Sequence, residues 1–172
     1  MEMIENKKLE ALLNAVFTAE NQKGHLKWKV SELARACKVS KSLVYYHLGK
    51  SKVEILYSCI DIVGAEFYGL NPTRENMVRS GDLISSIEYT RKMFMQTPAF
   101  TGFYVRWRMT QTDVGKRLEN LDNRYQAKLA ALFPKLNAVE REGLQAIFHG
   151  LVTSPKLDRT SMIAVLKWLP LG

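Results

Sequence analysis

Residues 29–48, KVSELARACKVSKSLVYYHL, have the pattern of two short helices joined by a tight turn. This layout is typical of the helix-turn-helix motif that reads DNA. In the first helix, apolar side chains recur at i, i+3, i+4 and i+7 and so share one face: Val30, Leu33, Ala34 and Cys37. The spacing predicts that this face packs inward while its polar neighbours face solvent.

The second helix of the pair begins after Ser40, whose hydroxyl is placed to accept a backbone N–H as an N-cap. Leu43 and Val44 are expected to anchor this helix in the core. The side chains left outside all donate hydrogen bonds or stack: Lys41, Ser42, Tyr45, Tyr46 and His47. Such a surface suits the edges and phosphates of a nucleic acid.

The charge of the chain is concentrated around this motif. Residues 23–52 hold eight basic side chains and one acidic one, Glu32, whereas the whole chain has a net charge of +8. A cluster of this kind favours a polyanionic partner. Lysines that only solvate a helical surface are the alternative interpretation.

The same segment resembles the DNA-binding domain of the TetR family of transcriptional regulators. The resemblance rests on Glu32-Leu33-Ala34, on residues 39–47 (VSKSLVYYH), and on Lys52 with Ile55-Leu56 at the start of the next helix. With the first helix it covers about a third of the chain. It implies an all-α fold, a homodimer bound to double-stranded DNA, and a C-terminal helical domain that often binds a small-molecule effector and releases the DNA.

Four positions depart from the family pattern. Lys38 stands where the turn usually has glycine, and a left-handed backbone there would cost a side chain about 1 kcal/mol. Leu48 replaces a phenylalanine, Lys29 replaces a capping threonine, and the connection 49–51 is one residue longer than usual. None of these changes removes an apolar anchor.

We expect Lys41, Ser42 and Tyr45 to reach base edges, since the N-terminal part of a recognition helix enters the groove. A second group is expected to contact phosphates and to set the position on the duplex. It comprises Lys27, Lys29, Ser31, Tyr46, His47, Lys50 and Lys52.

The remaining periodicity is also helical. A first helix is expected over residues 3–22 and ends near Gly24. A capping box of Ser51 with Glu54 is expected to start a long helix that runs through Phe67. Residues 69–73 should break it. Further helices are expected over 80–96, 98–109, 113–133, 137–152 and 158–169. We therefore expect a three-helix domain over 1–50 and a second helical domain over 51–172. The resemblance implies that the first binds DNA and that the second serves dimerisation and effector binding.

The resemblance assigns the last two helices to the dimer interface. The residues expected there are Gly143, Ala146, Ile147, Gly150, Ile163 and Leu166, and the small ones allow another helix to approach closely. An ordinary contact within one chain is the alternative.

An effector pocket is expected where aromatic side chains gather. These are Phe94, Phe100, Phe103, Tyr104, Trp107 and Tyr125. Plain core packing is the alternative interpretation of the same residues.

Composition limits the other classes of function. At 172 residues and 47% hydrophobic content the chain builds a real core, and it has no run approaching the roughly 18 apolar residues of a membrane span. The two cysteines, Cys37 and Cys59, each lie on an apolar helix face, which favours reduced thiols in a cytoplasmic protein.

No catalytic motif, cofactor loop or metal-ligand spacing is present, and the three histidines are far apart in sequence. We expect a regulator without catalytic residues, cofactor, metal or membrane partner. A helical module that binds an acidic protein through its basic N-terminal surface is the alternative.

Overall fold

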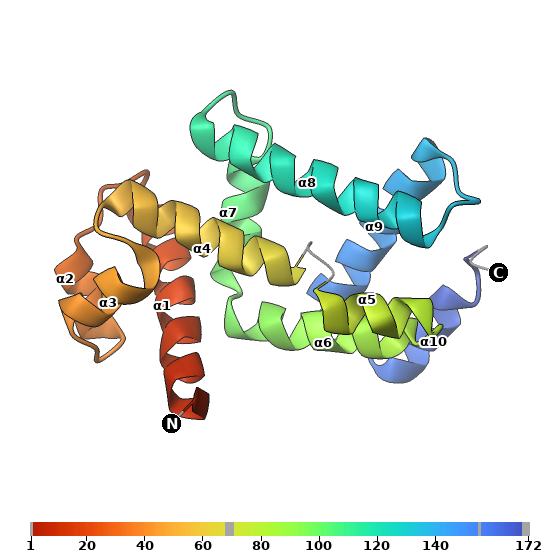
Figure 1. Cartoon of the computed structure of the whole chain (residues 1–172), viewed down its shortest axis with the longest axis horizontal. Helices are drawn as coiled ribbons and strands as arrows, with labels where there is room; N and C mark the ends of the chain where they lie inside the picture. The colour runs from red at the N-terminus through yellow and green to blue at the C-terminus, as the bar shows by residue number, and fades with distance from the viewer. Residues whose placement is uncertain (1, 68–70, 155, 170–172) are drawn as a thin grey trace. The chain divides into compact units, whose positions relative to one another are not determined.

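The computed structural model describes residues 2–67, 71–154 and 156–169, and in these residues all regular structure is helical (Figure 1). The expected all-α class is therefore confirmed. The helices are α1 (Glu2–Lys23), α2 (Val30–Ala36), α3 (Lys41–Leu48), α4 (Lys52–Phe67), α5 (Pro72–Arg79), α6 (Leu83–Gln96), α7 (Ala99–Trp107), α8 (Asp113–Leu132), α9 (Ala138–Thr153) and α10 (Arg159–Leu166). None of the described helices is both long enough and apolar enough to cross a membrane.

Contacts divide the chain into two compact units. Unit 1 comprises Met1–Ala65 and Met95–Asn120, and unit 2 comprises Glu66–Phe94 and Leu121–Gly172. Unit 1 therefore contains α7 and nearly all of α4 in addition to the helix-turn-helix. The sequence analysis places a boundary after residue 50, between a DNA-binding domain and the rest of the chain. The contact units do not show which residues bind DNA, so this boundary stays a prediction.

In unit 1, α1 packs against α7 and α2, and its apolar stripe forms the centre of the core. Phe17 is fully buried, and its ring lies 5.0 Å from those of Phe100 and Phe103, measured between centroids. Two asparagines of α1 hold the start of α7, because Asn14 accepts from the N–H of Ala99 and Asn21 donates to its carbonyl. These contacts fix α7 along α1.

A buried carboxylate at the end of α1 organises the segment that leads into α2. Glu20 is 0% exposed and accepts from the indole N–H of Trp28 at 2.5 Å and from the backbone N–H of Leu26 at 2.9 Å. Nδ1 of His25 lies 3.2 Å from its other oxygen. Buried charge is costly unless hydrogen bonds compensate it, and here one carboxylate serves three groups of a single loop.

The first and fourth helices follow their expected bounds closely. Gly24, with φ +89°, ends α1 as expected. The capping box at α4 is confirmed, because the N–H of Glu54 donates to the Ser51 hydroxyl and the Glu54 carboxylate accepts from the N–H of Ser51. The apolar face of α4 is fully buried along Ile55, Leu56, Cys59, Ile60 and Val63.

Helix α5 was not expected as a separate element. Gly69 and Leu70, where the sequence predicts a break, lie outside the described residues. Asn71 caps α5 by accepting from the N–H of Arg74 at 2.9 Å, and Pro72 occupies its first turn. The sequence PTRENMVR has too few apolar residues for a helical period to be visible.

In unit 2, polar side chains link neighbouring helices. Gln126 of α8 hydrogen-bonds Gln145 of α9, and Arg91 of α6 donates to the carbonyl of Leu151 in α9 at 3.3 Å. Glu88 of α6 forms an ion pair with Arg159 of α10. The first two of these bonds join helices that line the cavity described below.

We predict that Glu20→Ala lowers the free energy of unfolding by about 3 kcal/mol, because it leaves the donors of Leu26 and Trp28 buried without their acceptor. Chemical denaturation followed by circular dichroism measures this. Glu119→Ala, at an exposed position of α8, is the control and should change stability by no more than about 0.5 kcal/mol. Equal effects of the two substitutions would contradict the structural role of Glu20.

Candidate nucleic-acid interface

The helix-turn-helix of α2 and α3 is anchored by part of the expected set of side chains, and Leu43, expected in the core, is only half-buried. Leu33 and Ala34 are buried in α2, and Val44 is fully buried in α3. Leu48 is also buried, so it fills the position where the TetR-like pattern has phenylalanine. Ser40 caps α3, its hydroxyl accepting from the N–H of Leu43 at 3.1 Å. The outer face of α3 is thereby fixed relative to α2.

The turn between the two helices contains a residue in the left-handed region. Lys38 has φ +53°, and the N–H of the next residue, Val39, reaches back to the carbonyl of Ala34 at 2.9 Å. Lys38 therefore does adopt the left-handed backbone that the sequence analysis considered for this position. A lysine here bears a steric cost that glycine would avoid.

The outer face of α3 carries the residues expected to contact DNA. Lys41 and Ser42 are exposed at its N-terminal end, Tyr45 is 39% exposed and Tyr46 is 83% exposed. His47 is half-buried, with its ring 5.0 Å from that of Tyr46. Lys41 and Tyr45 lie one turn apart, as do Ser42 and Tyr46, so the four form two adjacent rows.

The expected phosphate contacts surround this face in sequence, and most are open to solvent. Lys27, Lys29, Lys50 and Lys52 are exposed and Ser31 is half-buried. The ammonium of Lys52 donates to the carbonyl of Leu26 at 2.9 Å. An ammonium has three donors, so this bond leaves capacity for a phosphate.

The acidic residue within the basic segment is engaged locally. The Glu32 carboxylate forms a 2.8 Å ion pair with Lys23 and accepts from the N–H of Lys29 at 3.0 Å. The side-chain bond from Lys23, followed by the backbone bond from Lys29, lowers the pKa of Glu32. Glu32 thus bonds the backbone N–H of the N-cap residue, Lys29, whose own side chain makes no capping bond.

The aromatic residues expected at an effector pocket are not gathered in one place. Phe100, Phe103 and Tyr104 are buried in α7, where the first two pack on Phe17 in unit 1. Trp107 is half-buried, its ring 5.1 Å from that of His25. None of these four residues lines the cavity described next, and their assignment to an effector site stays a prediction.

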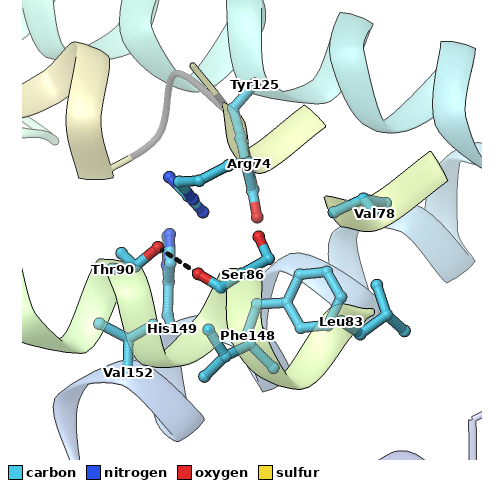
Figure 2. A pocket seen from close by; sticks show the side chains of 10 residues that line it. Arg74, Val78, Leu83, Ser86, Thr90, Tyr125, Phe148, His149 and Val152 are labelled. Carbon is cyan, nitrogen blue, oxygen red and sulfur yellow. Dashed lines mark hydrogen bonds between the residues drawn. The ribbon is translucent and has the colours of Figure 1, made fainter. Parts of the chain in front are cut away.

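A cavity does exist in unit 2, and of the expected residues Tyr125 lines it whereas the half-buried Phe94 does not. The cavity is small, with about 20 Å³ open to the centres of water-sized groups, which is room for one or two waters. Its lining comes from α5, α6, α8 and α9 (Figure 2): Arg74, Val78, Leu83, Ser86, Ile87, Thr90, Tyr125, Phe148, His149 and Val152. Sequence reasoning missed most of these residues. One available signal was the pair Ser86 and Thr90, spaced one turn apart on the face that also carries Ile87.

The helix faces expected at a dimer interface are open in the single chain. Gly143, Ala146, Gly150 and Ile163 are exposed, and Ile147 and Leu166 are half-buried. A Cβ built at Gly143 or Gly150 would meet nothing within 4 Å. Packing within the chain therefore does not require these two glycines.

The described residues contain no group of three or more histidine, cysteine or acidic side chains placed to hold a metal ion. Both cysteines are free thiols, with Cys59 buried and Cys37 half-buried.

The overall fold has a counterpart among solved structures. The fatty acid degradation regulator FadR from Bacillus halodurans superposes on this chain with a TM-score of 0.65 and 18% sequence identity. The superposition covers 95% of this chain and 98% of that one. No protein-family model matches the chain, and no curated protein sequence matches it. The likeness to FadR shows that the two chains share their fold over nearly their whole length.

We predict that Lys38→Gly stabilises the protein by about 0.5 to 1 kcal/mol, because glycine adopts φ +53° without the clash of a Cβ. Thermal and chemical unfolding measure the change. Lys38→Ala removes the same charge but keeps the Cβ, so it should bring no comparable gain. If alanine stabilises as much as glycine, backbone strain is not the cause.

Proposed function

We propose that this protein is a TetR-like transcriptional regulator that binds palindromic double-stranded DNA as a homodimer. The observation that carries the proposal is the outer face of α3, which is exposed and rich in donors while its inner face is held by Val44 and Leu48. The basic residues within 23–52 supply the charge that a duplex attracts. The shared fold with a protein described as a fatty acid degradation regulator supports this choice.

Within this proposal the side chains have two roles. Lys41, Ser42 and Tyr45 read base edges, since all three are exposed on α3 and the first two lie at its N-terminal end. A second group of residues contacts phosphates. These contacts do not depend on the DNA sequence, and they position the protein on the duplex. The residues of this group are Lys27, Lys29, Ser31, Tyr46, His47, Lys50 and Lys52.

Dimerisation is proposed through the open faces of α9 and α10. One short recognition helix reads too few base pairs for useful affinity, so a second copy is needed. The contact is proposed to use Gly143, Ala146, Ile147, Gly150, Ile163 and Leu166. The part of the chain beyond residue 50 then serves dimerisation and effector binding, and a small molecule bound there releases the DNA. We propose that the protein acts as a repressor and that it does so in the cytoplasm.

Selection from a random duplex pool at physiological salt, followed by titration of the winner and a scrambled duplex, tests the proposal. We expect a palindromic winner bound at least about a thousandfold more tightly than the scrambled sequence. Equal affinity for the two duplexes would contradict sequence-specific regulation. It would favour the binding of an acidic protein partner by the same surface.

We predict that Lys52→Gln weakens binding to all duplexes and lowers the slope of log K against log salt by about one, since one phosphate contact is lost. Fluorescence anisotropy at several salt concentrations gives the slope. Lys92→Gln, at an exposed position of α6, removes the same charge outside the proposed interface and should leave the slope unchanged. An unaltered slope for Lys52→Gln would show that Lys52 does not contact phosphate.

We predict that Ala146→Arg converts the dimer to a monomer without unfolding it, because Ala146 is exposed in the single chain. Sedimentation equilibrium gives the mass, and circular dichroism gives the fold. Ala127→Arg, at an exposed position of α8, should leave the dimer intact. A dimer that survives Ala146→Arg would place the interface elsewhere.

A further inference from the structure

The exposed face of α3 begins with a lysine that does not favour the stability of the helix. Lys41 is the first residue of α3, directly after the N-cap Ser40. The first turn of a helix carries a partial positive charge, so a cation there opposes folding. The neighbouring helices α2 and α4 have Glu32 and Glu54 in their first turns, whereas α3 has no acidic residue there. A role in binding accounts for a lysine at this position.

The ammonium of Lys41 is available to a ligand. Other lysines of the basic segment are engaged within the chain, because Lys23 forms a 2.8 Å ion pair with Glu32 and Lys52 donates to the carbonyl of Leu26 at 2.9 Å. Lys41 is exposed, and in the part of the chain that the structure describes it makes neither kind of bond. All three of its N–H donors are therefore open to a partner.

The two acidic residues nearest to Lys41 in sequence do not compete for its ammonium. Glu32 accepts from the N–H of Lys29 at 3.0 Å, and Glu54 accepts from the N–H of Lys50 at 2.7 Å. The bond from Lys50 is the main cause of a lowered pKa of Glu54. Both carboxylates are thus held by backbone donors at the starts of α2 and α4.

The place of Lys41 on α3 favours a contact with a base. Val44 and Leu48 are buried and hold the opposite face of the helix. Tyr45 lies one turn after Lys41 in the same row and is 39% exposed. Side chains at the N-terminal end of a recognition helix are those that reach base edges in the major groove. Lys41 is the cation of α3 at that end.

The chemistry of an ammonium selects among the four bases. An ammonium has donors and no acceptor, so it fits an edge that presents acceptors alone. In the major groove guanine presents two acceptors, O6 and N7. Adenine sets an amino donor beside its N7, cytosine presents an amino donor, and thymine sets a methyl group beside its O4. Guanine is therefore the base whose edge Lys41 matches best.

We propose that each half of the palindrome contains a guanine whose O6 and N7 accept from the ammonium of Lys41. This assignment rests on the DNA-binding function proposed above and names the base that the reading face selects. A phosphate oxygen is the other acceptor that suits an ammonium, and it would add affinity without any preference among bases.

The random-pool selection, run in parallel on variants, tests the assignment. The unaltered chain should fix a G·C pair at symmetric positions of the two half-sites. Lys41→Gln should lose guanine at those positions and turn toward adenine, because a glutamine amide pairs a donor with an acceptor. Lys50→Gln removes the same charge at a proposed phosphate contact and should keep the guanine. Both positions are exposed, and circular dichroism checks that the variants fold.

A modified duplex separates the base edge from the phosphates. The analogue 7-deazaguanine keeps the base pair and the backbone but lacks the acceptor N7. With this analogue at the guanine that depends on Lys41 in both half-sites, the unaltered chain should bind at least about fivefold more weakly than to the natural duplex. Lys41→Gln should bind the two duplexes equally. Fluorescence anisotropy at one salt concentration measures all four affinities.

The outcomes distinguish this assignment from the DNA-binding function itself. A palindrome without guanine, a guanine preference that survives Lys41→Gln, or equal affinity of the unaltered chain for the natural and modified duplexes would overturn the assignment and leave the regulator in place. If the unaltered chain selects no palindrome, the proposed function and the assignment both fail.

Discussion

The carboxylate of Glu20 is the constraint on which the DNA-binding surface depends. It is fully buried, and it binds Leu26 and Trp28 in the loop that delivers the chain to α2. A buried carboxyl group without those donors would be left unsatisfied, which ties the loop to this path. Because α3 packs on α2, the orientation of the proposed reading face follows from this hydrogen-bonded cluster.

The same helix that carries Glu20 also supports α7. Phe17 lies one turn earlier on α1 and packs against Phe100 and Phe103, while Asn21 bonds the first residue of α7. One helix therefore serves as the common support for the helix-turn-helix and for the core of unit 1. Unit 2 differs in character, because its buried polar side chains, Arg74 among them, line a cavity.

The helices with a long apolar period were predictable from sequence, and so were the capping serines Ser40 and Ser51. Helix α5 was not, because most of its side chains are polar. The position of Glu20 was available in principle, since it continues the apolar stripe of α1 one turn beyond Phe17, where burial is expected. The cavity was not predictable from local sequence patterns. Its lining residues Arg74, Thr90 and His149 lie on three separate helices, and the periodicity of one helix does not show which other helices it packs against.

Hydrogen–deuterium exchange of the full chain, with and without its selected duplex, tests most directly the claim that α3 is the reading element. The account predicts that protection on DNA binding is concentrated in α3 and in residues 49–52, with a smaller effect at the start of α2. Protection confined to α9 and α10, or absent from α3 while the duplex is bound, would contradict it.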